Sequence, residues 1–514
     1  MTSIGQGDRP ARLMQQDGPS RRGLLPLAAL PFLWGRAALA AEQTLVVGVA
    51  TFPESLMTGV SSITSANMLM QTYDPLVARD NSGAFVPALA ERWESVGDTA
   101  WRFHLRRGVK FHDGVEFTSA DVKFTIDRII DPKTAYGFLG RINQVSGAEI
   151  VDRYTVDIET RSIFPTLPKG LSDVPMEAEH YYAQVGPDVP KRRPLGTGPF
   201  AARNWVPGDR YELAANKDYW KGAPKFDRLL IRQIPEPATR LAALLSGEVQ
   251  IIEEVPVDSI DQINASRVGK VVSVPTSVGL VLTYDVRRPP FNDPKVREAL
   301  DYAIDKELIA KEILKGRAEV LQGQLVTRPT FGFNPAISAR PYDPDKARTM
   351  LQEAKFDFNA PVPIMTQSGK YVSDVEITNA VAGMLQEIGV KATVAVVESG
   401  VYLKQWSALE MGPIYMVGWY SLGDADFATV WYTKDGKRTT WTNTEYERLF
   451  IEARSTTDPA ARERSYHQMM AIMHRENPSM FLFGLPSIYA VGNKISGFHA
   501  AADKILRLGD VTFA

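Results

Sequence analysis

The sequence of 514 residues predicts a mixed α/β fold with more than one compact part. Two segments, residues 240–252 and 382–397, each run from an apolar helical pattern through a glycine into an apolar strand pattern. Glycine commonly ends a helix, and a helix followed at once by a strand is the joint expected of α/β layers. With 44% hydrophobic residues, a chain of this length can bury a large core, and its length predicts two or more domains or lobes.

The first strand is expected at residues 44–50, an apolar and β-branched run that ends shortly before Pro53. A helix is expected to begin after Thr118, because Thr118 and Asp121 have the spacing of a capping box. In a capping box, each of the two side chains accepts a backbone N–H of the other residue. These elements place a strand and then a helix in the first quarter of the chain.

Three further helix starts share the dipeptide Asp-Pro. Aspartate caps the first N–H groups of a helix, and proline fits the first helical position because it lacks an N–H. These dipeptides predict helices over residues 295–316, 345–354 and 460–476. In the first of the three, apolar residues recur at steps of three to five and form one stripe, which predicts a helix packed on a core.

The composition excludes several classes of site. The chain has no cysteine, so disulfides, thiolate zinc sites, iron–sulfur clusters and a lipid-modified cysteine are all excluded. The six histidines stand singly, with no pair at metal-ligand spacing. A net charge of −2 and the lack of a Lys/Arg run give no reason to expect nucleic acid or an anionic membrane. We therefore expect no cofactor, no metal site and no nucleic-acid partner.

Residues 1–40 have the pattern of an export signal. An arginine pair at 21–22 precedes an apolar stretch at 24–34 and a small-residue cleavage site at 38–40. The order Ser-Arg-Arg-Gly-Leu-Leu at 20–25 resembles a twin-arginine signal, and the alternative is an ordinary secretory signal. We expect a soluble periplasmic protein that is not a lipoprotein.

Motifs of common enzymes are missing. The sequence contains no G-x-S-x-G, no H-E-x-x-H and no G-x-x-x-x-G-K-[ST] motif. The nearest glycine-rich turn, Gly196-Thr197-Gly198, is followed by Pro199, which prevents a helix from opening there onto a phosphate. The sequence therefore predicts no enzyme. A hydrolase that uses a pair of carboxylates needs no motif and remains the alternative from another functional class.

Three long segments, residues 89–129, 195–252 and 289–318, resemble the extracellular solute-binding proteins, family 5. They include "WRFHLRRGVKFHDGVEFTSADVKF", "LGTGPF" with "DYWKG", and "PPFNDPKVREALDYAID". This family includes the dipeptide-, oligopeptide-, glutathione- and nickel-binding proteins of ABC importers. The resemblance extends over essentially the whole chain after residue 40, to the closing segment 477–498.

The resemblance implies an α/β, two-lobe clamshell of class II, cluster C type, with an extra inserted subdomain. Lobe I is expected to comprise residues 41–62, 195–280 and 486–514, with the inserted subdomain at 63–194. Lobe II is expected at residues 281–485. A solute that touches both lobes would stabilise their closed arrangement by its differential affinity.

The function that the resemblance implies is capture of a small solute for import. The protein would be the periplasmic solute-binding component of an ABC importer, a monomer that delivers a peptide or peptide-like amine to membrane permease subunits. An opine, a sugar conjugate or a metal chelate is the alternative solute within the same family. Because solute capture breaks no bond, the resemblance agrees with the absence of catalytic motifs.

Two aspartates form the first candidate ligand site. In peptide-binding members of the family, a Gly-Trp pair leads into a loop whose aspartate pairs with the α-ammonium of the peptide. Gly418-Trp419 matches that pair, but the position of the dipeptide binders' aspartate is Leu422, and the acids follow at Asp424 and Asp426. Either carboxylate could anchor a cationic group. Alternatively, Asp424 caps a helix that begins next to it, with Asp426 in the first turn.

Aromatic residues near these acids are further candidates. Trp419 and Tyr420 offer flat apolar faces with polar tips, and Trp406 could do the same from a preceding helix. Each of the three could equally belong to the core.

The resemblance adds three more candidates. Tyr284 and Asp285 correspond to the strand whose backbone lies along peptides in the family. Met57 stands in the segment after the first strand, where the family usually has Leu-Asp-Pro. Its flexible apolar side chain would accept a variable solute group or would fill a gap in the core.

Overall fold

The computed structural model describes residues 42–514 except 59–62, 135–141, 435 and 437. The predicted export signal at residues 1–40 lies outside the described residues. Residues Glu42–Ala514 form one unit by their internal contacts. No helix in the described part of the chain is long and apolar enough to cross a membrane.

One large mixed sheet dominates this unit. Its strands lie in the order β15-β14-β16-β12-β17-β11-β1-β10-β9-β8, and β13 pairs with β17 outside this path. In that order the strands are Lys391–Val396, Pro361–Thr366, Ile414–Tyr420, Gly269–Tyr284, Ser479–Gly492, Ile251–Ile252, Thr44–Val49, Arg228–Gln233, Arg210–Ala215 and Phe200–Val206, with β13 at Glu319–Val320. The strand predicted at residues 44–50 is thus confirmed as β1.

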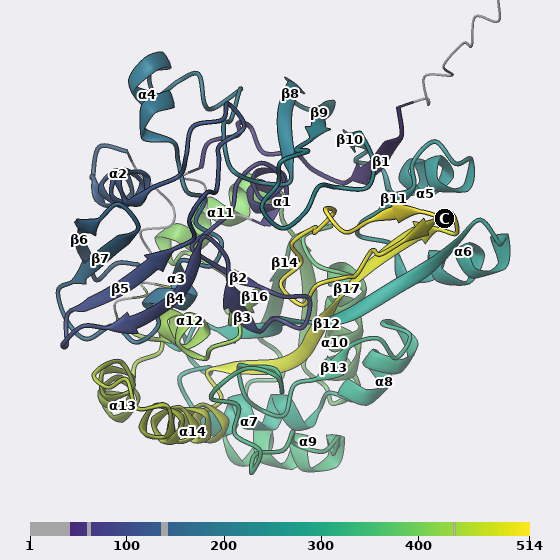
Figure 1. Ribbon diagram of the computed structural model, residues 1–514. Coiled ribbons are helices and arrows are strands. Elements are labelled where there is room, and N and C mark those ends of the chain that lie inside the picture. The colour runs from purple at the N-terminus through teal and green to yellow at the C-terminus, as the bar shows by residue number, and fades with distance from the viewer. Residues whose placement is uncertain (1–41, 59–62, 135–141, 435, 437) are drawn as a thin grey trace, which may run out of the picture. The chain divides into compact units, whose positions relative to one another are not determined.

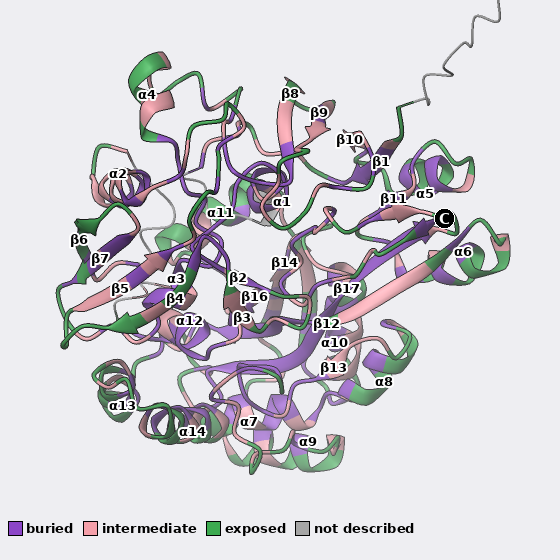
Figure 2. Cartoon of the chain, viewed as in Figure 1, coloured by how far each residue is buried: buried purple, intermediate pink, exposed green. Residues whose placement is uncertain are grey.

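The two longest strands, β12 and β17, pair with one another across the middle of the sheet (Figure 1). The first half of β12 pairs with the last half of β17, and the second half of β12 also pairs with β16. Their register is broken between Pro275 and Gly279, and Pro275 lies opposite Pro486. Proline donates no ladder hydrogen bond, which explains an irregularity at this point. The exposure of β12 also changes here, from partly exposed to buried from Thr276 onward (Figure 2).

Two groups of parallel strands flank this pair. On one side, β1 is parallel to both β10 and β11. On the other side, β14 is parallel to both β15 and β16. Within each group the carboxyl ends of the strands meet at one edge, which is where α/β sheets commonly bind ligands.

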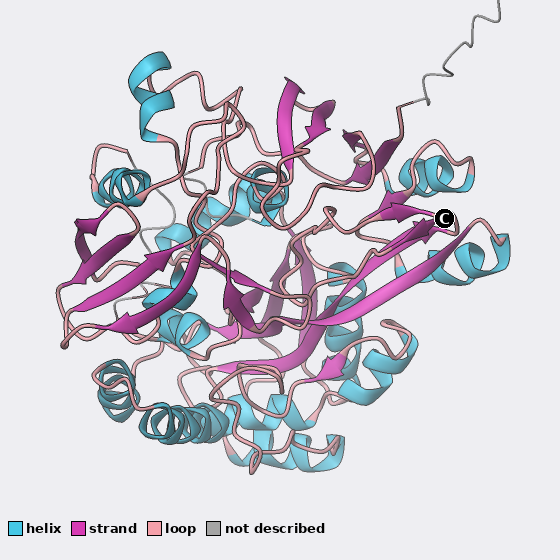
Figure 3. Ribbon diagram, in the orientation of Figure 1, coloured by secondary structure: helices cyan, strands magenta, loops and turns pink. Residues whose placement is uncertain are grey.

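Helices, drawn in cyan in Figure 3, pack on both faces of β12 and of the strands beside it. Leu280 and Leu282 of β12 pack with α7 to α10, whereas Val281 packs with α13 and α14. Alternate residues of a strand point to opposite faces, so these two helix groups lie on opposite sides of the sheet. The helices are α7 (Pro294–Tyr302), α8 (Lys306–Glu312), α9 (Pro344–Glu353), α10 (Asp374–Glu387), α13 (Thr444–Arg454) and α14 (Pro459–Glu476). Shorter helices near them are α11 (Ser399–Ala408), α12 (Asp426–Thr429) and the 3₁₀ turn η3 (Val430–Tyr432).

Residues 76–178 contain a second, smaller core. A four-stranded antiparallel sheet has the order β4-β5-β7-β6, and α2 packs on it. These elements are β4 (Ala90–Ser95), β5 (Ala100–Leu105), β6 (Val145–Asp152), β7 (Thr155–Thr160) and α2 (Ser119–Ile130). The predicted capping box is confirmed, because the Thr118 N–H donates to Asp121 Oδ2 at 2.9 Å and the reciprocal bond is present.

The remaining elements are short. They are α1 (Ile63–Leu69), β2 (Val77–Arg79), β3 (Phe85–Pro87), α3 (Leu167–Gly170), α4 (Glu179–Val185), α5 (Pro237–Leu245), η2 (Val257–Ser259), α6 (Ile260–Ser266), β18 (Ile495–Ser496) and β19 (Thr512–Phe513). Both predicted helix–glycine–strand joints are confirmed, as α5 to β11 and as α10 to β15, with Gly247 and Gly389 at positive φ. The lobe boundaries stay a prediction.

The helix predicted over residues 295–316 is wrong as a single element. The chain forms α7 and α8 with a break between them, at residues 303–305. Asp305 accepts a hydrogen bond from the Leu308 N–H at 2.9 Å and so caps a second helix. An aspartate in the middle of a helical pattern competes for backbone N–H groups and therefore signals the start of a new helix. The apolar periodicity continues past Asp305 and hides this signal.

Candidate functional site

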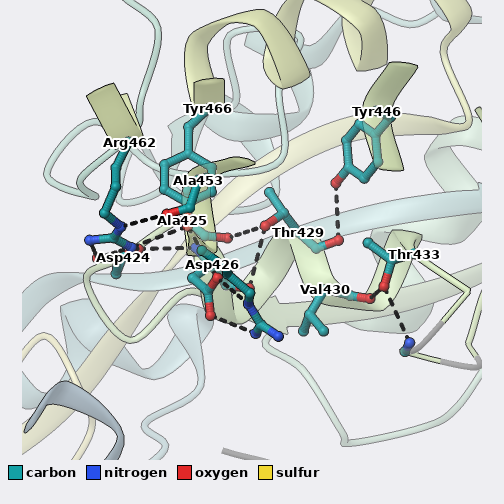
Figure 4. Close-up of polar contacts among 12 residues, drawn as sticks. Asp424, Ala425, Asp426, Thr429, Val430, Thr433, Tyr446, Ala453, Arg462 and Tyr466 are labelled. Carbon is teal, nitrogen blue, oxygen red and sulfur yellow. Dashed lines mark hydrogen bonds and ion pairs between the residues drawn. The ribbon is translucent and has the colours of Figure 1, made fainter. Parts of the chain in front are cut away.

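Asp424 lies in the loop after β16 and Asp426 begins α12; both are buried. Figure 4 shows their polar contacts. Asp424 accepts hydrogen bonds from Arg462 of α14 at 3.0 and 3.2 Å, and from Lys169 of α3 at 2.6 Å. Its Oδ1 also accepts the Asp426 N–H at 3.1 Å. Two cations thus face this carboxylate, and both of its oxygens have donors within the protein.

Both carboxylate oxygens of Asp426 also have donors within the protein. Arg454 of α13 donates two hydrogen bonds to it, each 2.7 Å long, and the Tyr466 hydroxyl donates a third at 3.1 Å. Burial by itself would raise the pKa of this carboxyl group, but the charges of Arg454 and Arg462 outweigh it and hold the pKa below the usual range. Asp426 is therefore an ionised, internally neutralised group.

The local backbone explains why acids stand here. Leu422 and Gly423 both have positive φ, which turns the chain from β16 towards α12. The helix begins at Asp426, and the side chain of Asp424 accepts an N–H of its first turn. This bond is of the kind expected under the capping interpretation of Asp424.

Trp419 lies in the core on the α13/α14 side of the sheet. It is 5% exposed, and its ring stacks on Trp431 at 5.6 Å between centroids. Trp406 of α11 lies 5.9 Å from the same ring, and the guanidinium of Arg438 sits over Trp406 at 4.4 Å. Among the described residues, the indole N–H of Trp406 has no hydrogen-bond acceptor. These rings form one aromatic cluster.

Tyr420 points to the opposite side of β16 from Trp419, since the two are consecutive strand residues. Gly418 shares the Tyr420 side, and its N–H donates to the Tyr371 hydroxyl at 2.8 Å. A Cβ atom on Gly418 would lie 2.6 Å from the Tyr371 ring, so only glycine fits at this position. Tyr420 is partly buried at the carboxyl end of β16.

Tyr284 and Asp285 lie at the far end of β12 from the register break. The backbone of Tyr284 pairs with β16, and its N–H donates to Pro478 O at 3.2 Å. Asp285 accepts hydrogen bonds from Arg287 and Arg288, each at 2.9 Å. Strands β16 and β17 therefore flank this end of β12 on its two sides. Within the described residues, no unpaired edge is left there to which the backbone of a peptide could add.

Met57 is partly buried in the segment between β1 and α1. This segment follows the carboxyl end of β1 and so belongs to the edge formed by β10, β1 and β11. Among the eight candidates, Met57 follows β1 at one carboxyl edge, whereas Tyr420, Asp424 and Asp426 end or follow β16 at the other.

Glu253, which the sequence analysis passed over, stands at the same edge as Met57. It directly follows β11, is partly buried, and accepts a hydrogen bond from the Ala50 N–H at 3.2 Å. Burial and the neighbouring Glu254 raise the pKa of its carboxyl group to about 8. Within the described residues no lysine, arginine or histidine forms an ion pair with Glu253. Two acids placed immediately after a buried strand were the signal that could have identified it.

Tyr489 lies near residues of both edges. It lies on β17, and burial together with the nearby charges of Glu253 and Tyr420 raises the pKa of its hydroxyl group. Glu253 comes from the β1 group of strands and Tyr420 from the β14 group. One side chain from each parallel group therefore lies near Tyr489, close to the end of β17.

A cavity of about 290 Å³ lies elsewhere, between residues 70–86 and the C-terminal residues 503–510. Four of its charged groups form ion pairs with one another. Arg79 lies 3.3 Å from both Asp173 and Asp503, and Arg507 pairs with Asp503 at 2.6 Å. These pairs hold the C-terminal segment in place, so we do not assign the solute to this cavity.

Comparison with protein families identifies the chain. Residues 84–440 match the model described as "Bacterial extracellular solute-binding proteins, family 5 Middle", which is more than half of the sequence. The chain belongs to this family. Members are solute-binding components of ABC importers and are not enzymes, so the predicted class of function is confirmed, with a small solute and permease subunits as partners.

Relatives of the family agree with this assignment. The glutathione-binding protein GsiB of Escherichia coli (strain K12) is 26% identical over 503 residues, which cover 94% of this chain and 97% of GsiB. The periplasmic binding protein DppA from Helicobacter pylori, solved with the peptide STSA, has a TM-score of 0.80 at 23% identity and covers 92% of this chain and 98% of its own. The PBP AgaA from A.tumefacien R10, solved with agropinic acid, has a TM-score of 0.79 at 24% identity and covers 92% and 99%. The two structures share the predicted periplasmic-binding-protein fold.

Proposed function

We propose that this family 5 protein is the periplasmic component that captures a peptide or peptide-like amine and delivers it to an ABC permease. The protein would act as a monomer after export and removal of residues 1–40. The near full-length similarity to a glutathione-binding protein supports a peptide-like solute.

One observation carries the proposal. The carboxyl ends of two parallel strand groups bring Glu253 and Tyr420 to the same strand, β17, around Tyr489. Ligands of α/β sheets bind outside such carboxyl ends, and sites between two parts of a chain are favoured because both can contact the ligand. An acid and two phenol groups supply hydrogen-bond partners for amide and ammonium groups.

The proposal assigns Asp424 and Asp426 to the scaffold. Both carboxylates already have arginine partners, and a solute ammonium would have to displace one of them. A buried acid whose charge is balanced gains little from a second cation. Trp419 and Tyr284 likewise serve the core in this proposal, because both are buried among other apolar residues.

A binding assay tests the solute class. We expect the purified protein to gain thermal stability from at least one member of a panel of di- to pentapeptides that includes glutathione, because a ligand that binds only the folded state raises its stability. The bound peptide should be recovered intact after long incubation. A panel without any stabilising member, tested beside opines and sugar conjugates that do stabilise the protein, would contradict the peptide assignment.

A further inference from the structure

Seven of the ten buried acids in the described residues have a cationic partner. Besides Asp424 and Asp426, three other deeply buried carboxylates follow this pattern: Asp301 pairs with Lys306 at 2.6 Å, Asp503 with Arg507 at 2.6 Å, and Glu177 with Arg128 at 2.8 Å. An ionised carboxylate removed from water is costly without such a partner. The other three buried acids, Asp74, Asp121 and Asp374, accept hydrogen bonds from neutral groups instead.

Glu253, which is partly buried, also lacks a cationic partner, and its position is fixed by its surroundings. Its backbone N–H donates to Gly48 O at 3.3 Å, and its side chain accepts the Ala50 N–H. The guanidinium of Arg240, which acts on Glu253, is used by backbone carbonyls, since it donates to Glu253 O at 3.0 Å and Glu254 O at 3.1 Å. Arg240 thus holds the loop in place and leaves the carboxylate of Glu253 without an ion pair.

The other charged groups around Glu253 do not neutralise it. Glu254 follows it on the same loop and adds a second negative charge. Lys504, from the C-terminal segment, acts on Glu253 from a distance, and no ion pair joins the two. Tyr489 on β17 faces the same group. Arg240 and Lys504 offset the charge of Glu254, but neither cation forms an ion pair with Glu253, so its carboxylate could still receive a cation.

We propose that Glu253 binds the cationic amine group of the solute. This inference rests on the proposed function, since it requires a solute that carries an amine. A carboxylate in partly desolvated surroundings forms charge-assisted hydrogen bonds with an ammonium group, and these are about twice as strong as bonds between neutral groups. Glu253 would thereby take the role that the family's aspartate cannot take here, because its position holds Leu422.

The test compares Glu253→Gln with the matched control Glu254→Gln. Both substitutions remove one carboxylate from the same loop and keep the size of the side chain. Binding of the best peptide from the panel is measured by isothermal titration calorimetry, together with the same peptide acetylated at its amine. We expect Glu253→Gln to weaken binding of the free peptide about 100-fold, and Glu254→Gln to change it less than about threefold.

Acetylation separates a lost contact from a damaged protein. The acetylated peptide should bind wild-type protein about 100-fold more weakly than the free peptide, and Glu253→Gln should not weaken it further. Circular dichroism melting confirms that both variants are folded. If Glu253→Gln bound the free peptide within threefold of wild type, or if Glu254→Gln showed the large loss instead, the inference would be overturned while the proposed function stood. If wild-type protein bound no peptide, the proposed function would be contradicted, and so would the role of Glu253 that rests on it.

Discussion

Two acidic regions of this protein, one fully and one partly buried, differ in the cations that contact them. The loop with Asp424 and Asp426 contains two buried carboxylates that face Arg462, Arg454 and Lys169. The end of β11 has a partly buried carboxylate, Glu253, without an ion pair among the described residues. Burial alone therefore does not distinguish a structural acid from one that could receive a ligand. The number of cations already in contact does distinguish them.

The pKa shifts of Asp426 and Glu253 follow the same difference in cationic partners. Arginine partners hold the pKa of Asp426 below its usual range despite burial, whereas burial and Glu254 raise that of Glu253 to about 8. The first acid is charged at neutral pH because the protein supplies its partner. The second holds a proton at neutral pH until a cation arrives.

The largest effect is expected where a buried ion pair is broken. Arg454→Met should lower the free energy of unfolding by about 3 kcal/mol, because it leaves Asp426 buried without its bidentate partner. Urea unfolding at pH 7 measures this change. Arg448→Met, on the same helix but in exposed ion pairs with Glu445 and Glu452, is the matched control and should change stability little. Equal losses in the two variants would mean that Asp426 does not depend on Arg454.

A second effect is expected from the proton on Glu253. With a pKa of about 8, the carboxyl group is mostly protonated in the free protein at pH 7, and an ammonium bound to it would expel that proton. Titration calorimetry in buffers of different ionisation enthalpy should show about 0.9 proton released for each peptide bound at pH 7. Glu253→Gln should release none, and an unchanged proton release in that variant would contradict the assignment.

The same pKa predicts a gain in stability for Glu253→Gln. The folded state holds this proton more tightly than the unfolded chain, so the stability of wild type falls as pH rises from about 4.5 towards 8, and the full cost remains above that pH. Without solute, the variant should therefore melt above wild type at pH 8 and show a smaller difference at pH 5. A residue that costs stability and is needed for binding is the expected trade-off at a functional site.

The sequence predicted several elements of the scaffold correctly, whereas the site residues stay a prediction. Local signals sufficed for the strand at residues 44–50, for the capping box of Thr118 and for both helix–glycine–strand joints, because each depends on neighbouring residues. The helix over 295–316 was predicted as continuous because periodicity does not register the cap formed by Asp305.

The site could not be predicted in the same way, because its chemistry depends on residues far apart in the chain. Nothing near Asp424 in the sequence indicates that Lys169, 255 positions away, donates to it. In the same way, Glu253 has no local motif, and its lack of a cation becomes visible only when β1, β11 and β17 are placed side by side. A sequence pattern identifies where acids stand, whereas their partners decide what the acids do.

The smallest effect is expected from the contact between Lys169 and Asp424. It joins the segment predicted as the inserted subdomain to the segment predicted as lobe II, and Lys169 also lies 5.0 Å from the ring centroid of Phe331. If the two segments separate when the solute leaves, Lys169→Met should weaken peptide binding about fivefold, because about 1 kcal/mol of closed-state stabilisation is lost. Lys191→Met, which removes an exposed pair with Asp188, is the control. Binding that is unchanged in Lys169→Met would mean that this contact persists in both states, and the acids at 424 and 426 would then belong entirely to the scaffold.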